Sequence, residues 1–141
     1  MKTTIESGAA IKYLSDYTKE GISELYDRLG AFFAFSTKQF KESAVKGEKY
    51  MSLGSGTVVP QRNAAALVDG VAEVIAKGIE ADKGDHTPEQ IILRELRNHE
   101  CFYVGSPCAA IDKLKNYGDG FGESEVRKVF ARAWDKETED L

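Results

Sequence analysis

The chain has 141 residues, of which 42% are apolar and 30% charged, and its formal net charge is −4 with both signs interspersed. This length suits one folded domain, and the composition excludes a disordered or fibrous protein. The charge excludes general nucleic-acid binding through a basic field, and no apolar run approaches the roughly 18 residues of a membrane span. We expect one domain over residues 1–141, with flexible ends at 1–8 and 136–141.

The first residues and the cysteines indicate an intracellular protein. The opening MKTTIESGAAIK lacks the charged-then-apolar layout of a secretory signal. Two cysteines, Cys101 and Cys108, are too few for a disulfide framework. We expect a reducing compartment.

The first third of the chain predicts a helix, a strand and a second helix. Apolar residues three and four apart predict a helix over 9–29 that ends at Gly30. The aromatic run 31–35, AFFAF, predicts a buried strand. Ser36 and Gln39 form a capping-box pattern, which predicts a short helix that fades toward Gly47.

The middle of the chain predicts one strand and one long helix. Residues 49–59 alternate and are then interrupted by glycines, so we expect a strand with a bulge or bend at 54–56. Asn63 can cap a helix that reaches about residue 82. Small residues on this helix predict close approach of another backbone, or of a second subunit; they are Ala66, Gly70, Val74 and Gly78.

The last third predicts three helices and one strand. DKGDH, residues 82–86, reads as a loop, and Thr87 and Gln90 then cap a helix over about 88–99. The apolar run 101–104 predicts a third strand. Two more helices follow, one after Ser106-Pro107 and one after the glycine-rich turn at 119–122.

Together these elements predict an α+β fold. About three short strands would form a small sheet packed by five to six helices around one layered core. The aromatic residues lie on the predicted strands without basic residues between them, so we expect them in the core rather than in a base-stacking platform.

The segment 54–63, GSGTVVPQRN, is the most suggestive candidate site. Glycines can bring a backbone close to a ligand, an arginine donates hydrogen bonds, and a helix start binds anions. The spacing matches neither the P-loop nor the dinucleotide fingerprint, so a simple bulge and turn stays open. The candidate ligand-binding residues are Gly54, Ser55, Gly56, Arg62 and Asn63.

A second candidate group is the run NHE, which comprises Asn98, His99 and Glu100. Nucleophilic catalysis would need His99 and Cys101 close together. They would share a face of a strand but diverge at a helix end. No oxyanion hole is evident. The alternative is a histidine at a helix C-terminus and a cysteine in the core. The spacings of the candidate metal ligands, His86, His99, Cys101 and Cys108, fit no structural zinc pattern, so we expect no metal. We also expect no cofactor.

Four segments carry a resemblance to a known family. They are FFAFSTKQF at 32–40, GEKYMSLGSGTVVPQRN at 47–63, ELRNHECFYVG at 95–105 and GFGESEVRKVF at 120–130. Over about 24–130 the chain resembles a family of unknown function found in small bacteriophage and gut-bacterial proteins. Gly122 departs from the threonine cap of its relatives, which leaves the start of the last helix open. The resemblance implies a phage or mobile-element origin and a bacterial cytoplasm, but no catalytic residues.

We therefore expect a non-enzymatic interaction protein, an accessory of a phage or mobile element that blunts a host defence or otherwise modulates the host. Its partner would be a host protein. The alternatives are a binder of nucleotides or other anionic small ligands through 54–63, and a small enzyme that uses His99, Glu100 or Cys101. Homo-oligomerisation stays open.

Overall fold

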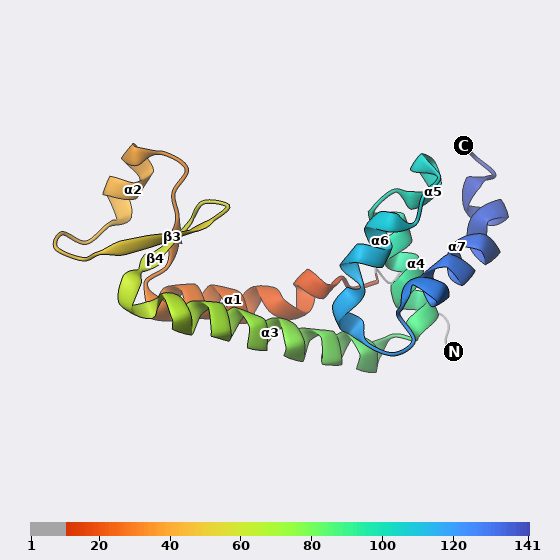
Figure 1. Cartoon of the computed structure of the whole chain (residues 1–141), viewed down its shortest axis with the longest axis horizontal. Helices are drawn as coiled ribbons and strands as arrows, with labels where there is room; N and C mark the ends of the chain where they lie inside the picture. The colour runs from red at the N-terminus through yellow and green to blue at the C-terminus, as the bar shows by residue number, and fades with distance from the viewer. Residues whose placement is uncertain (1–10) are drawn as a thin grey trace. The chain divides into compact units, whose positions relative to one another are not determined.

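The computed structural model of the chain describes residues 11–141 and confirms an α+β protein (Figure 1). Among these residues, helices predominate and the strands form one small antiparallel sheet. The α-helices are α1 (Leu14–Leu29), α2 (Thr37–Ser43), α3 (Ala64–Asp85), α4 (Pro88–Asn98), α5 (Cys101–Val104), α6 (Cys108–Lys113) and α7 (Glu123–Thr138). The strands are β2 (Phe32–Phe33), β3 (Tyr50–Gly54) and β4 (Thr57–Pro60), and short 3-10 helices are η1 (Gln61–Asn63) and η2 (Lys115–Tyr117).

The chain divides into two compact units. The sheet unit is Leu14–Gly78, which holds α1, α2, all three strands and most of α3. The helical unit is Ile79–Leu141 with the segment before Leu14, and it holds the end of α3 and α4 to α7. The expectation of one domain over 1–141 stays a prediction. The expected flexible end at 1–8 and residues 9–10 of the helix expected at 9–29 lie outside the described residues. Residues 11–13 are not helical, so the expected start of this helix is wrong and α1 begins at Leu14.

In the sheet unit, α1 and α3 pack side by side (Figure 1). A methyl group on Gly78 would lie 2.5 Å from Cγ2 of Thr18, and one on Gly70 would lie 2.9 Å from Cδ2 of Leu25. Both glycines therefore let α1 come closer to α3 than an alanine would. The predicted close approach of another backbone is confirmed at Gly70 and Gly78, where the partner is a helix of the same chain, whereas Ala66 is exposed.

The sheet has the order β2-β4-β3, and both pairs of strands are antiparallel. Strand β4 is central and wholly buried, with Val59 0% exposed in a core. The other buried members of that core are Leu25, Ala64 and Leu67. One face of β4 is therefore fixed against α1 and α3.

The single strand predicted over 49–59 is wrong, because β3 and β4 form a hairpin. Gly54, Ser55 and Gly56 all have positive φ, at 90°, 52° and 82°. Three such residues in a row reverse the chain rather than bend it. A register shift between Ser52 and Gly54 does retain an irregularity at the predicted place. Pro60 ends the second strand, as expected.

The buried strand predicted at 31–35 is shorter and more exposed than expected. Only Phe32 and Phe33 pair with β4. Phe33 is 57% exposed and Phe35 is 74% exposed, with their rings stacked at a centroid distance of 6.4 Å. The run is apolar, but β2 is an edge strand that pairs only with β4, and no element among residues 11–141 buries the rings of Phe33 and Phe35.

Helix α2 begins at the predicted cap. The Gln39 N–H donates to Oγ of Ser36, while Oε1 of Gln39 accepts from the Phe35 N–H rather than from Ser36. Phe40 of α2 forms edge contacts with Tyr50, and both rings contact Phe32. The helix ends at Ser43, before the expected fading toward Gly47.

The helical unit corrects two predictions. Residues 82–85 of DKGDH continue α3 and are not a loop, and Asp82 of this turn is held by the buried partners Arg94 and Tyr117. Residues 101–104 form the short helix α5 rather than a strand, bracketed by left-handed residues Glu100 and Gly105. A run of four apolar residues does not distinguish a buried helical turn from a strand by periodicity.

The remaining helices agree with their sequence signals. The predicted capping box of α4, made by Thr87 and Gln90, is present. Helix α7 begins after Gly122, which makes no side-chain cap, and continues to Thr138. Asn63 lies in η1 directly before α3, and its Nδ2 donates to the Leu29 carbonyl. Among residues 11–141, every helix is too short or too polar to cross a bilayer.

Candidate functional site

The candidate residues of 54–63 lie at the two ends of β4. Gly54, Ser55 and Gly56 form the hairpin turn before the strand, whereas Arg62 and Asn63 lie in η1 after it. Four extended residues span about 13 Å, so the structure does not bring the glycines and the arginine together.

The side chains of Arg62 and Asn63 in η1 already have protein partners. Nη2 of Arg62 donates to Oε1 of Glu48 over 3.2 Å, and Nδ2 of Asn63 donates to the Leu29 carbonyl over 2.9 Å. The Arg62 side chain is largely exposed. Arg62 and Asn63 thus connect η1 to the loop before β3 and to the end of α1.

The second candidate group lies at the junction of α4 and α5. Asn98 is the last residue of α4, His99 is its C-cap, and Glu100 adopts a left-handed conformation with φ of 54°. Nε2 of His99 lies 3.4 Å from Oε1 of Glu95, although the pair lacks hydrogen-bond geometry. The expectation of His99 at a helix C-terminus is confirmed.

Cys101 lies in the core, as expected for a cysteine that acts as a small apolar residue. It is 0% exposed, and burial raises the pKa of its thiol. A raised thiol pKa keeps the less nucleophilic protonated form. His99 lies against Glu95, whereas Cys101 lies in α5. The two residues therefore do not share the face of a strand, as joint action in catalysis would require.

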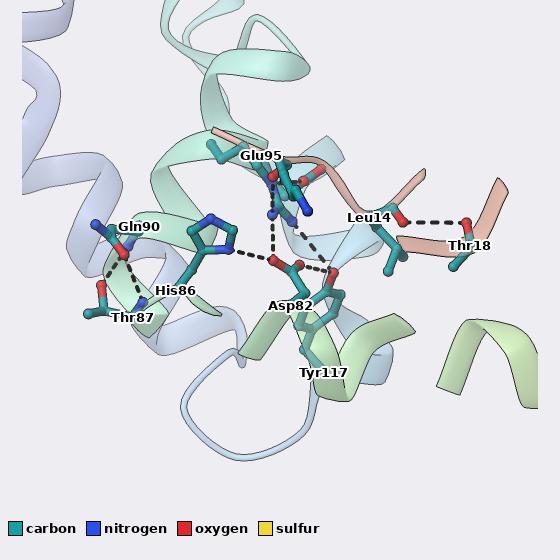
Figure 2. Close-up of polar contacts among 10 residues, drawn as sticks. Leu14, Thr18, Asp82, His86, Thr87, Gln90, Glu95 and Tyr117 are labelled. Atoms are coloured by element: carbon teal, nitrogen blue, oxygen red, sulfur yellow. Dashed lines mark hydrogen bonds and ion pairs between the residues drawn. The ribbon is translucent and has the colours of Figure 1, made fainter. Parts of the chain in front are cut away.

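Sequence reasoning missed a buried ionic cluster in the helical unit. We call it the Asp82 cluster; its members are Asp82, His86, Arg94, Glu95 and Tyr117. Figure 2 shows Asp82 between His86 and Tyr117. The residues come from the end of α3, the residue after it, α4 and η2.

Arg94 is the centre of this cluster and is only 2% exposed. Its Nη1 donates to Oδ1 of Asp82 over 2.8 Å, and its Nε donates to Oε2 of Glu95 over 2.7 Å. Nη1 also donates to the Lys12 carbonyl over 3.0 Å. One guanidinium therefore holds two buried carboxylates and the segment before α1.

Asp82 accepts from three side chains. The Tyr117 hydroxyl donates to Oδ2 over 2.7 Å, and Nδ1 of His86 donates to Oδ1 over 2.9 Å. Burial alone would disfavour the charged carboxylate, but the hydrogen bonds from Arg94 and Tyr117 and the charge of Arg94 outweigh it. The pKa of Asp82 is therefore lowered from its ordinary 3.8. Burial and the bond to Asp82 raise the pKa of Tyr117.

The Asp82 cluster is suited to holding elements together rather than to reacting with a substrate. Asp82 is 0% exposed, Tyr117 is 2% exposed, and their polar groups are used by one another. Charges buried in this way persist only when they are paired and hydrogen-bonded. Within residues 11–141, no three His, Cys, Asp or Glu side chains form a group that could hold a metal.

The sheet unit contains a region of the opposite kind, which we call the open layer and define as residues 31–56. It comprises β2, α2, β3 and their connections. Every residue of this range is described, and none of them is buried. Its exposed large apolar residues are Phe33, Phe35, Val45, Met51 and Leu53.

Two clefts border the open layer. The first, of about 570 Å³, lies along α1 and β2 and is lined by Ile22, Tyr26, Phe32 and Phe33 among others. The second, of about 320 Å³, lies between α2 and the start of β3. Its apolar lining includes Phe40, Val45 and Tyr50, and its charged lining is Lys41, Lys46 and Glu48.

Comparison with known families places the chain. A family model matches residues 14–136, a wider span than the resemblance over 24–130. The chain belongs to DUF7659, a family of unknown function. The family assignment leaves the phage or gut-bacterial origin as a prediction. Neither the curated proteins nor the solved structures contain a match to this DUF7659 chain.

Proposed function

We propose that this chain is a non-enzymatic protein-binding module and that the open layer is its contact surface. The observation that supports the proposal is the exposure of a complete strand-helix-strand segment that carries five large apolar side chains. Apolar residues scattered singly over a surface are ordinary, whereas a contiguous group marks an interaction site.

The exposed aromatic pair at the edge of the sheet supports this role. Phe33 and Phe35 stack on one another, and the Tyr26 ring lies 5.2 Å from that of Phe33 beside the larger cleft. Aromatic side chains next to a groove are typical anchors of protein interfaces. In its fuller form the proposal is that a phage or mobile-element protein uses this surface on a bacterial host protein.

Capture from bacterial lysate with a matched pair of variants tests the proposal. Phe35→Ser removes an aromatic ring of the open layer, and Tyr103→Ser removes an equally exposed ring of the helical unit, since both residues are 74% exposed. We expect a host protein that is captured by the wild type and by Tyr103→Ser but lost with Phe35→Ser. Capture that is unaffected by Phe35→Ser, or the absence of any specific partner, contradicts the proposed surface.

A further inference from the structure

Four lysines of the open layer give it a charge opposite to that of the rest of the chain. The open layer, residues 31–56, holds four lysines and two glutamates, a net charge of +2, so the remainder of the chain carries −6 against the total of −4. The lysines are Lys38, Lys41, Lys46 and Lys49, and all four are exposed. The open layer is thus a basic island on an acidic protein.

The ammonium groups of these lysines have no partners among the described residues. Arg62, which lies beyond the open layer, differs because it pairs with Glu48. The other acid of the open layer, Glu42, is exposed and forms no ion pair among the described residues. The positive charge of the lysines is therefore available to another molecule.

The smaller cleft places apolar and basic groups side by side. The Val45 N–H donates to the Tyr50 hydroxyl over 2.8 Å, which closes the loop between α2 and β3 around the cleft. Val45 itself is 67% exposed, and Lys41 and Lys46 line the same cleft. Glu48 also lines it, but the carboxylate of Glu48 is paired with Arg62. Its volume of about 320 Å³ is at the small end of ligand pockets, which suits a side chain of a partner better than a cofactor.

From these features we propose that the open layer binds an acidic peptide segment, which seats one apolar side chain in the cleft between α2 and β3 and places carboxylates near Lys41 and Lys46. This inference rests on the proposed function and names the chemistry of the partner. The charge of −6 on the remainder of the chain repels an extended polyanion such as a nucleic acid more than a short acidic peptide. Face-to-face pairing of two copies is disfavoured because it would oppose their lysines.

Selection of a random peptide library on the full chain tests this inference, with binding of enriched peptides then measured by fluorescence polarisation. We expect acidic residues around one aromatic or aliphatic residue. Lys41→Gln/Lys46→Gln should weaken binding by about tenfold, whereas Lys113→Gln/Lys128→Gln, an exposed pair in the helical unit, should not. Higher salt should also weaken binding of the wild type. Amide NMR spectra of each variant check that α2 is retained.

The outcomes separate this inference from the proposed function. Enriched peptides without acidic residues, or equal binding by both lysine variants, overturn the acidic partner but leave the open layer as the surface if Phe35→Ser still abolishes binding. Enrichment of no peptide overturns the inference, as does lysine-dependent binding of a single-stranded oligonucleotide alone. Concentration-dependent dimerisation in light scattering that Phe35→Ser removes would assign the surface to a second copy instead.

Discussion

The helical unit and the open layer use large side chains in opposite ways. Phe102 of the helical unit is 6% exposed and its ring stacks at 5.1 Å on that of Phe130. Phe35 of the open layer also stacks on a neighbouring ring, yet it is 74% exposed. The helical unit even buries an ionic cluster, whereas no residue in 31–56 is buried.

This difference shows that a segment can be folded locally without a core of its own. The open layer is held by strand pairing to β4, by the cap of α2 and by the aromatic contacts of Phe32, Phe40 and Tyr50. These interactions specify its shape but remove little apolar surface from water. A partner that covers the layer would supply the missing burial.

The largest effect expected is from Arg94→Met in the helical unit. It would leave two carboxylates buried without their cation, which typically costs about 3–5 kcal/mol. The matched control is Arg97→Met, on the same helix, which removes the surface pair with Glu137 and should cost below about 1 kcal/mol. Urea unfolding followed by circular dichroism measures both. Equal costs would show that the buried cluster contributes no more than a surface pair.

Tyr117→Phe should destabilise the protein by about 1.5–3 kcal/mol, because a hydrogen bond to the charged Asp82 is lost. The lowered pKa of Asp82 contributes stability above pH 3.8 that is lost as pH falls through the folded-state value. Removing the hydroxyl raises that folded-state pKa, so acid unfolding should begin at a higher pH.

Tyr26→Phe is the control for the pH profile, because its hydroxyl is hydrogen-bonded to Oγ1 of Thr57, a group without charge. We expect a cost of about 1 kcal/mol that is the same at neutral and at acid pH, because no charged group is involved. Unfolding measured at a series of pH values distinguishes the two variants. An unchanged acid transition in Tyr117→Phe would refute the assigned role of Tyr117.

Gly78→Ala tests the close packing of α3 on α1 in the sheet unit. The added methyl group would meet Thr18 at 2.5 Å, and we expect destabilisation of about 1–3 kcal/mol. Gly84→Ala, near the end of the same helix, adds a methyl group with nothing within 4 Å and should stabilise by up to about 1 kcal/mol. Thermal unfolding gives both signs; a stabilising Gly78→Ala would contradict close contact between α1 and α3.

The smallest effect on stability is expected in the open layer. Phe35→Ser loses a stacked but exposed ring, so its unfolding free energy should fall by about 1 kcal/mol or less. Phe102→Ala, by comparison, should cost about 3–5 kcal/mol. Chemical denaturation compares them directly. Similar losses would mean that the Phe35 ring is part of a core.

The sequence predicts those elements that carry local signals. The capping residues before α2 and α4 and the glycine after α1 mark ends that the structure confirms. The sequence predicts one bent strand where the structure has a hairpin at Gly54–Gly56. The turn needs a positive φ at Ser55, and serine seldom adopts one.

What the sequence does not predict depends on tertiary contacts. DKGDH has the composition of a loop, and only the positions of Arg94 and Tyr117 make its Asp82 a buried helical residue. A signal is present in retrospect, since Asp82 and His86 are four apart, as are Glu95 and His99. The exposure of Phe35 is not predicted either, because composition does not reveal that β2 lies at the edge of the sheet.

Hydrogen exchange of the full chain, free and with the captured partner, tests the open layer most directly. We predict that amides of α2 and β3 exchange much faster than those of α4 and α7 in the free chain, and that the partner slows exchange chiefly within residues 31–56. Equal protection of these elements in the free chain, or slowing confined to the helical unit, would contradict the account.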